Sequence, residues 1–115
     1  EAELTGANLS EMRMEEASFE SAGLRGAIFA KSYVERGRFV RAELSGARFE
    51  KAMLRYADFS HAVLERAALI DADLRYANFH RAVDRDADWT NAKTTGLRRV
   101  DADLAAAEDF RPPRA

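Results

Sequence analysis

The side chains best suited to chemistry in this sequence are two histidines, His61 and His80, with Asp58 and Ser60 close to the first of them. A hydroxyl, an imidazole and a carboxylate could form a nucleophilic triad, and two imidazoles with a carboxylate could hold a metal ion. The chain has no cysteine, and it contains no glycine-rich phosphate loop or nucleophile elbow. Whether the histidines act together depends on the elements that hold them.

An alanine recurs every five residues along most of the chain, and a large apolar residue follows two positions later. An α-helix would scatter such residues over all of its faces, because five residues turn through about 140°. A β-strand would alternate them between its two faces. The period therefore predicts a solenoid in which each pentapeptide forms one short side of a tube.

The number of sides follows from the large residues, because side chains stacked in successive coils tend to be alike. Large residues match more often at a spacing of 20 than at 15 or 25, which indicates four sides and roughly five coils. We expect the matching columns to form the structural core. The columns are Phe19, Phe39, Phe59 and Phe79; Leu24, Leu44 and Leu64; and Phe29 with Phe49.

The repeated motif has the form Ala-(Asp/Asn)-(Leu/Phe)-X-X. It is clearest at Ala7-Asn8-Leu9, Ala57-Asp58-Phe59, Ala72-Asp73-Leu74, Ala77-Asn78-Phe79, Ala87-Asp88-Trp89 and Ala102-Asp103-Leu104. This pattern resembles the pentapeptide-repeat family over nearly the whole chain. The resemblance implies an all-β fold, a right-handed quadrilateral β-helix. In such a fold the alanine and the large residue point inward and the other three residues point outward.

The repeat fails mainly near the carboxy-terminal end, where Asp84, Thr94 and Arg99 take positions that large apolar residues fill elsewhere. An ionised aspartate is expensive inside an apolar tube. We therefore expect the coil to loosen at Asp84, with Val83 or water satisfying the site.

We divide the chain into a β-helix at residues 1–93 and an irregular final coil or helical cap with a proline-containing tail at 94–115, forming one domain. Asp101 could serve as the N-cap of such a helix, and Pro112-Pro113 would stop it. A cap is expected because the open core and sheet edge must be covered. The alternative is a further coil with Leu104 inward. The residues on one side of the helix would be Val100, Leu104, Ala107 and Arg111.

An exposed Phe110 would offer a self-association contact at the same end. The family resemblance implies dimers that form through the carboxy-terminal ends. A homodimer of that kind is therefore one expected assembly.

One outer face is rich in tyrosine and arginine, the residue types that dominate binding hot spots. Two interpretations remain open, a surface for a protein partner and a ladder of exposed tyrosines that stabilises the sheet. The face carries Tyr33, Met53, Tyr56 and Tyr76, interleaved with Arg36, Arg55 and Arg75.

The neighbouring face is basic, and a solvated face of mixed charge is a simpler interpretation than a site for phosphate or an acidic partner. Its histidines would project from a convex surface without a pocket. We therefore expect no catalysis, no metal and no cofactor. The face carries Arg38, Arg41, His61, His80 and Arg81, against Glu20, Asp58 and Asp101.

Eighteen basic and 20 acidic residues give a net charge of -2, which argues against nucleic acid and anionic membranes as ligands. The apolar runs are too short for a membrane span or a signal peptide, so a cytoplasmic location is the default expectation. We expect a non-enzymatic bacterial module that binds an unknown protein partner, as part of a larger, for example secretion-associated, chain. The resemblance also implies an alternative, a DNA mimic that binds and protects gyrase, although mimicry needs a strongly anionic rod.

Overall fold

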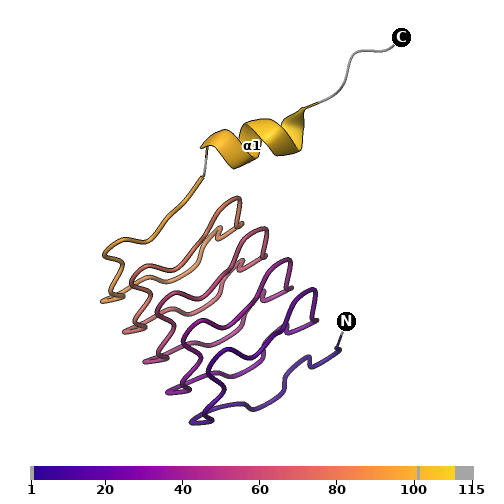
Figure 1. The fold of residues 1–115 in the computed structure, drawn as a ribbon. Helices are drawn as coiled ribbons and strands as arrows, with labels where there is room; N and C mark the ends of the chain where they lie inside the picture. Colours follow the sequence, from indigo (N-terminus) through magenta and orange to yellow (C-terminus); the bar gives the residue numbers. More distant parts are fainter. Residues whose placement is uncertain (1, 101, 111–115) are drawn as a thin grey trace.

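The computed structural model describes residues 2–100 and 102–110, which form a stack of coils followed by one helix (Figure 1). One residue of each pentapeptide pairs in parallel with the residue 20 positions later, from Glu3 with Gly23 to Asn78 with Arg98. The column of Glu3, Gly23, Glu43, Val63 and Val83 links five successive coils. The regular pairing thus extends beyond residue 93, where the sequence placed the end of the repeat.

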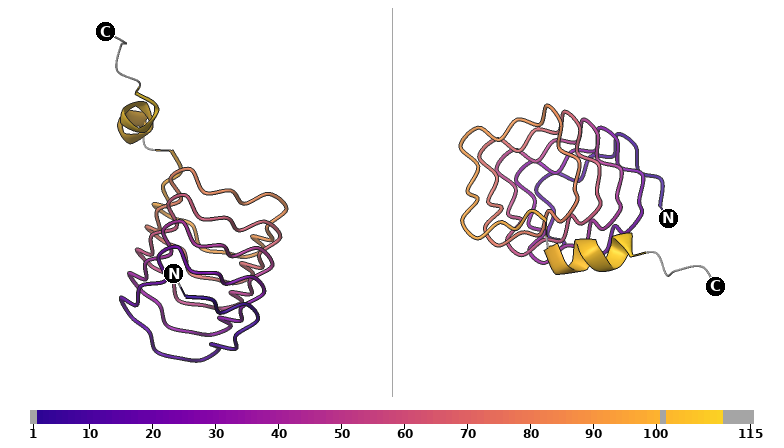
Figure 2. Two further views of the ribbon diagram at one scale, coloured as in Figure 1. Left: turned by 90° about the vertical axis from the view of Figure 1, so that its right-hand side faces the viewer. Right: turned by 90° about the horizontal axis from the view of Figure 1, so that it is seen from above.

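Turns follow each pairing residue and give every coil four short sides (Figure 2). The second turn residue has a positive φ, for example 71° at Gly6 and 60° at Glu11. A hydrogen bond from the Ala7 amide to the Leu4 carbonyl, at 2.9 Å, closes one such turn. Each side is very short, so the described residues pair through isolated bridges. None of these bridges extends into a longer β-strand.

Aromatic rings fill the centre of the tube. The rings of Phe39 and Phe59 stack at 4.7 Å with 3° between their planes, and those of Phe29 and Phe49 stack at 4.8 Å and 6°. The two columns meet edge to face, as Phe49 and Phe59 do at 5.9 Å and 85°. Alanines share this space with the rings, because only a small side chain fits beside a phenylalanine in so narrow a core.

The predicted core residues are fully or nearly fully buried, apart from Phe19. Phe19 is half-buried because it belongs to the first coil, which has no coil stacked beneath it among the described residues. The fully or nearly fully buried members are Phe39, Phe59, Phe79, Leu24, Leu44, Leu64, Phe29 and Phe49.

Asp84 does not loosen the last coil. The bridge between Val63 and Val83 is intact, and Val83 stays on the outside with 40% of its surface exposed. The expectations that the coil loosens at Asp84 and that Val83 satisfies the site are therefore wrong. Arg99 instead reaches Asp84 at 3.0 Å, and its guanidinium lies over Trp89, 5.1 Å from the ring centroid. The side chains of Arg99 and Asp84 are 52% and 25% exposed, so this partly solvated ion pair occupies positions where other coils hold apolar residues.

Helix α1 spans Ala102–Asp109 and is the one helix among the described residues. In the view from above, α1 lies along one edge of the coils (Figure 2). The open pocket at the end of the tube is lined by the last coil, including Trp89, Leu97 and Arg99, and by no described residue of α1. A helix thus forms where one was expected, but it does not cover that opening.

The sequence also predicted an N-cap at Asp101, a helical position for Arg111 and a stop at Pro112-Pro113. These three predictions fall outside the described residues. No helix in the described part of the chain is long and apolar enough to cross a membrane.

Candidate partner-binding surface

The tyrosine face is defined here by the seven residues that the sequence singled out, and the coil spacing brings them together. Tyr33 pairs with Met53 across neighbouring coils, and Met53 pairs in turn with Asp73. Tyr56 and Tyr76 occupy the turn at the edge of the same side, with φ of 61° and 64°. The seven residues are Tyr33, Met53, Tyr56, Tyr76, Arg36, Arg55 and Arg75.

The exposed tyrosines form a ladder that runs along the solenoid. The rings of Tyr56 and Tyr76 stack at 5.1 Å and 13°, while 51% and 49% of the two residues stay exposed. The guanidinium of Arg36 lies 5.2 Å from the Tyr56 ring centroid. At the other end Tyr76 lies against Gly96, where a Cβ would approach its ring to 2.4 Å. Each ring is therefore fixed by its neighbours and still presents an open surface.

A buried aspartate, which sequence reasoning missed, fixes the two arginines beside the ladder. Asp73 is 4% exposed, and its Oδ2 accepts hydrogen bonds from Arg55 Nε at 2.9 Å and from an Arg75 terminal nitrogen at 2.8 Å. Arg75 Nε donates to the other oxygen at 2.9 Å. Hydrogen bonds from Arg75, and then from Arg55, hold the pKa of Asp73 well below its usual value, although burial opposes the shift.

The signal for this cluster is present in the sequence. In a coil of 20 residues, positions i and i+18 are diagonal neighbours in adjacent coils. Charge pairs recur at this spacing, and Arg55 with Asp73 is one of them. The others are Arg25 with Glu43 and Glu20 with Arg38.

An open groove adjoins the tyrosine ladder. Tyr56 and Tyr76 form its aromatic wall, and polar side chains, including those of Asp58, Asn78 and Arg98, line the rest. A groove of this kind can take an apolar side chain against the rings and a polar group against the opposite wall. The side of the solenoid is therefore not uniformly convex.

The neighbouring basic face carries α1. Arg81 donates two hydrogen bonds to Asp109, at 2.9 and 2.7 Å, so part of the basic column lies beneath the helix. Ser60 donates from both its amide and its hydroxyl to Asp58, as Thr90 does to Asp88. Since the same contact recurs two residues apart, it is a local turn motif, and the structure does not arrange Ser60 and Asp58 as a nucleophilic triad.

A family model of pentapeptide repeats, in 8 copies, matches residues 2–39, 38–67 and 54–83. The chain belongs to the pentapeptide-repeat family. The matched segments contain the whole core of stacked phenylalanines and all seven residues of the tyrosine face. No curated protein matches the chain.

Solved structures of pentapeptide-repeat proteins are similar to this chain. One from the thylakoid lumen of Arabidopsis thaliana is 28% identical with a TM-score of 0.53, over 84% of this chain and 63% of that one. Rfr23 from the cyanobacterium Cyanothece 51142 is 22% identical with a TM-score of 0.58, over 84% and 86%. QnrB1, a plasmid-mediated fluoroquinolone resistance protein, is 20% identical with a TM-score of 0.38, over 89% and 71%.

These similarities bear on the fold and not on a shared activity. The chain spans less than two thirds of the length of the Arabidopsis protein, and the identity to Rfr23 is low. The TM-score to QnrB1 is too low to support an argument. The first two similarities imply a right-handed β-helix.

Proposed function

We propose that this pentapeptide-repeat protein is a non-catalytic interaction module that binds a protein partner through its tyrosine face. The observation that carries the proposal is the ladder of Tyr56 and Tyr76, which is half exposed but held by stacking. Tyrosine supplies a large contact area with few rotatable bonds, so an already ordered ring loses little entropy on binding. A rigid right-handed quadrilateral β-helix of roughly five coils would present the ladder as a fixed strip.

The arginines next to the tyrosine ladder indicate which chemical groups a partner would present to this surface. Arg55 and Arg75 keep 41% and 31% of their side chains exposed while Asp73 fixes their positions. A partner can therefore meet ordered N–H donors without the cost of immobilising two long side chains. The matching segment would place an apolar or aromatic side chain in the groove and acceptor oxygens over the arginines.

The alternative, a DNA mimic that protects gyrase, has no support on this surface. Mimicry needs rows of unopposed carboxylates, whereas arginines pair with carboxylates along the solenoid, as Arg48 does with Glu50 at 2.8 Å. The overall charge of -2 agrees with a mixed surface. We expect titration of the protein into a gyrase supercoiling assay, with and without a quinolone, to have no effect.

A homodimer through the carboxy-terminal end remains a prediction. Phe110, with 61% of its surface exposed, would be the contact. Sedimentation equilibrium of the wild type and of Phe110→Ser checks it, because a dimer through this end should dissociate in the variant.

The test of the proposed function is site-specific photocrosslinking in the native host. A benzophenone amino acid is placed at Tyr56 in one strain and at Arg66 in another. Arg66 is a matched control because it is exposed and has the same turn geometry, φ 58° against 61°, two sides of the coil away. We expect a discrete protein adduct from position 56 and none from position 66. Equal adducts from both positions, or none from position 56, would contradict the proposal.

A further inference from the structure

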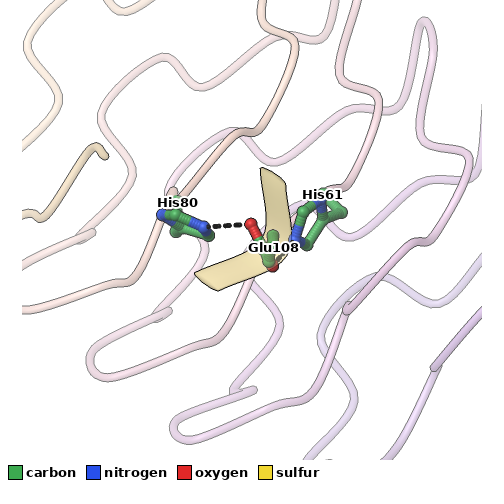
Figure 3. Close-up of side chains that lie close together, drawn as sticks. All are labelled: His61, His80 and Glu108. Carbon is green, nitrogen blue, oxygen red and sulfur yellow. Dashed lines mark hydrogen bonds and ion pairs between the residues drawn. The ribbon is translucent and has the colours of Figure 1, made fainter. Parts of the chain in front are cut away.

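Two histidines and one glutamate converge where α1 lies against the solenoid (Figure 3). His61 Nε2 lies 2.8 Å from one carboxylate oxygen of Glu108, and His80 Nε2 lies 2.9 Å from the other. One ligand atom from each residue lies within 4.8 Å of the others. Both imidazoles therefore aim a nitrogen at the same small volume.

This geometry differs from the sequence prediction that both histidines project from an open convex face. His80 is fully buried, and its side chain and that of His61 face Glu108 on α1. The third member comes from a helix outside the repeat, so the periodicity of the sequence could not place it there. The histidines therefore do not lie on the open convex face on which the expectation of no metal site was based.

The solenoid holds the two imidazoles in place. The His61 amide donates to the His80 carbonyl at 2.9 Å, so the two residues are paired neighbours in adjacent coils. Their rings meet edge to face at 5.4 Å, and the His80 amide also donates to Asn78 Oδ1. Two of the three groups are thus positioned by backbone hydrogen bonds, and only Glu108 depends on the position of α1.

We propose that His61, His80 and Glu108 bind a zinc ion that fixes α1 to the side of the solenoid. Two imidazole nitrogens and one carboxylate oxygen suit zinc, whereas calcium and magnesium prefer all-oxygen sites. Zinc bonds of about 2.0–2.2 Å require ligand atoms roughly 3.3–3.5 Å apart in a tetrahedron. The two distances from the histidine nitrogens to the Glu108 oxygens, 2.8 and 2.9 Å, would lengthen by about 0.5 Å, and the widest separation among the ligand atoms, at most 4.8 Å, would shorten. Water would complete the fourth position.

The charged group closest to this site is Arg81, whose Nε lies 3.6 Å from Glu108 Oε1. A guanidinium at that distance opposes the binding of a cation. Its charge is offset by Asp109, which accepts two hydrogen bonds from it. Zinc would also replace the hydrogen bonds between the histidines and Glu108 with three coordination bonds, so α1 would gain a stronger attachment than it has without metal.

The test begins with zinc chloride titrated into EDTA-treated and desalted full-length protein, followed by calorimetry. We expect one zinc ion per chain, and at least about a 100-fold loss of affinity in His61→Ala and in Glu108→Gln. His61 is the histidine to replace because its side chain is 24% exposed, whereas His80 is buried and its loss could disturb folding. Ala106→Gln is the control on the same helix, because Ala106 is exposed and is not one of the three ligands, and we expect less than about a tenfold change in affinity.

Two further measurements distinguish specific zinc binding by His61, His80 and Glu108 from adventitious binding elsewhere on the protein. Cobalt should give the intense visible absorption of a tetrahedral site, and this absorption should disappear in Glu108→Gln. Zinc should also slow amide hydrogen exchange in α1 of the wild type and leave it unchanged in His61→Ala. Weak binding at several sites that survives both substitutions, or stoichiometric binding without protection of α1, would overturn the proposal.

Discussion

Replacing Phe59 by alanine should remove a large part of the stability of the solenoid. Phe59 is completely buried and contacts three rings, those of Phe39 at 4.7 Å, Phe79 at 4.8 Å and Phe49 at 5.9 Å. Truncation of a buried phenylalanine costs about 3–5 kcal/mol in total, and the loss of ring contacts, each worth roughly 0.5–1.5 kcal/mol, places Phe59 in the upper part of that range. The coils above and below are tied by backbone hydrogen bonds, so the cavity cannot collapse easily. We expect a loss of about 4–5 kcal/mol.

Urea denaturation followed by circular dichroism measures this loss. Arg25→Ala is the surface control, because the Arg25 side chain is 65% exposed and makes only a surface ion pair, and we expect its free energy of unfolding to change by less than about 0.5 kcal/mol. Phe19→Ala, in the same column as Phe59 but in the half-buried first coil, should fall between the two. A loss below about 1 kcal/mol for Phe59→Ala would refute the stacked core.

Three other substitutions test the contacts around the core. Asp73 has a folded pKa below its unfolded value of about 3.9, so its contribution to stability is present above that pH and is lost as the pH falls through the folded pKa. Asp73→Asn should cost roughly 1.5–3 kcal/mol at pH 7 and should flatten the loss of urea stability between pH 5 and pH 2. Gly37→Ala should destabilise by about 1–3 kcal/mol in the same assay, because its Cβ would lie 2.6 Å from Val34 Cγ1. Ser32→Ala should change the free energy of unfolding by less than about 1 kcal/mol, because it restores the repeat's alanine and removes only a hydroxyl that donates to the Phe29 carbonyl.

The repeat predicted the features of the fold that depend on spacing alone. A step of 20 residues places Phe39 over Phe59, and the structure stacks these two rings. The same step places Tyr56 over Tyr76 on the outside. That the outer ladder binds a partner stays a prediction, because the spacing of the repeat predicts where a side chain lies and not what it binds.

The sequence did not predict contacts between residues of different pentapeptides or between the solenoid and α1. Asp73 reads as an ordinary outward residue of its repeat, and only the diagonal spacing to Arg55 reveals a buried ion pair. Asp84 looked incompatible with the core because its partner, Arg99, belongs to a different pentapeptide. Glu108 lies on a helix whose docking position no repeat encodes.

The affinity of the crosslinked partner for variants of the tyrosine face tests the central claim most directly. The partner captured through position 56 is titrated against the wild type, against the double variant Tyr56→Ala with Tyr76→Ala, and against Arg66→Ala. Binding through the tyrosine face predicts at least about a 30-fold weaker affinity for the double variant, as expected for loss of a hot spot, and an unchanged affinity for Arg66→Ala. Equal affinity for the wild type and the double variant would contradict it.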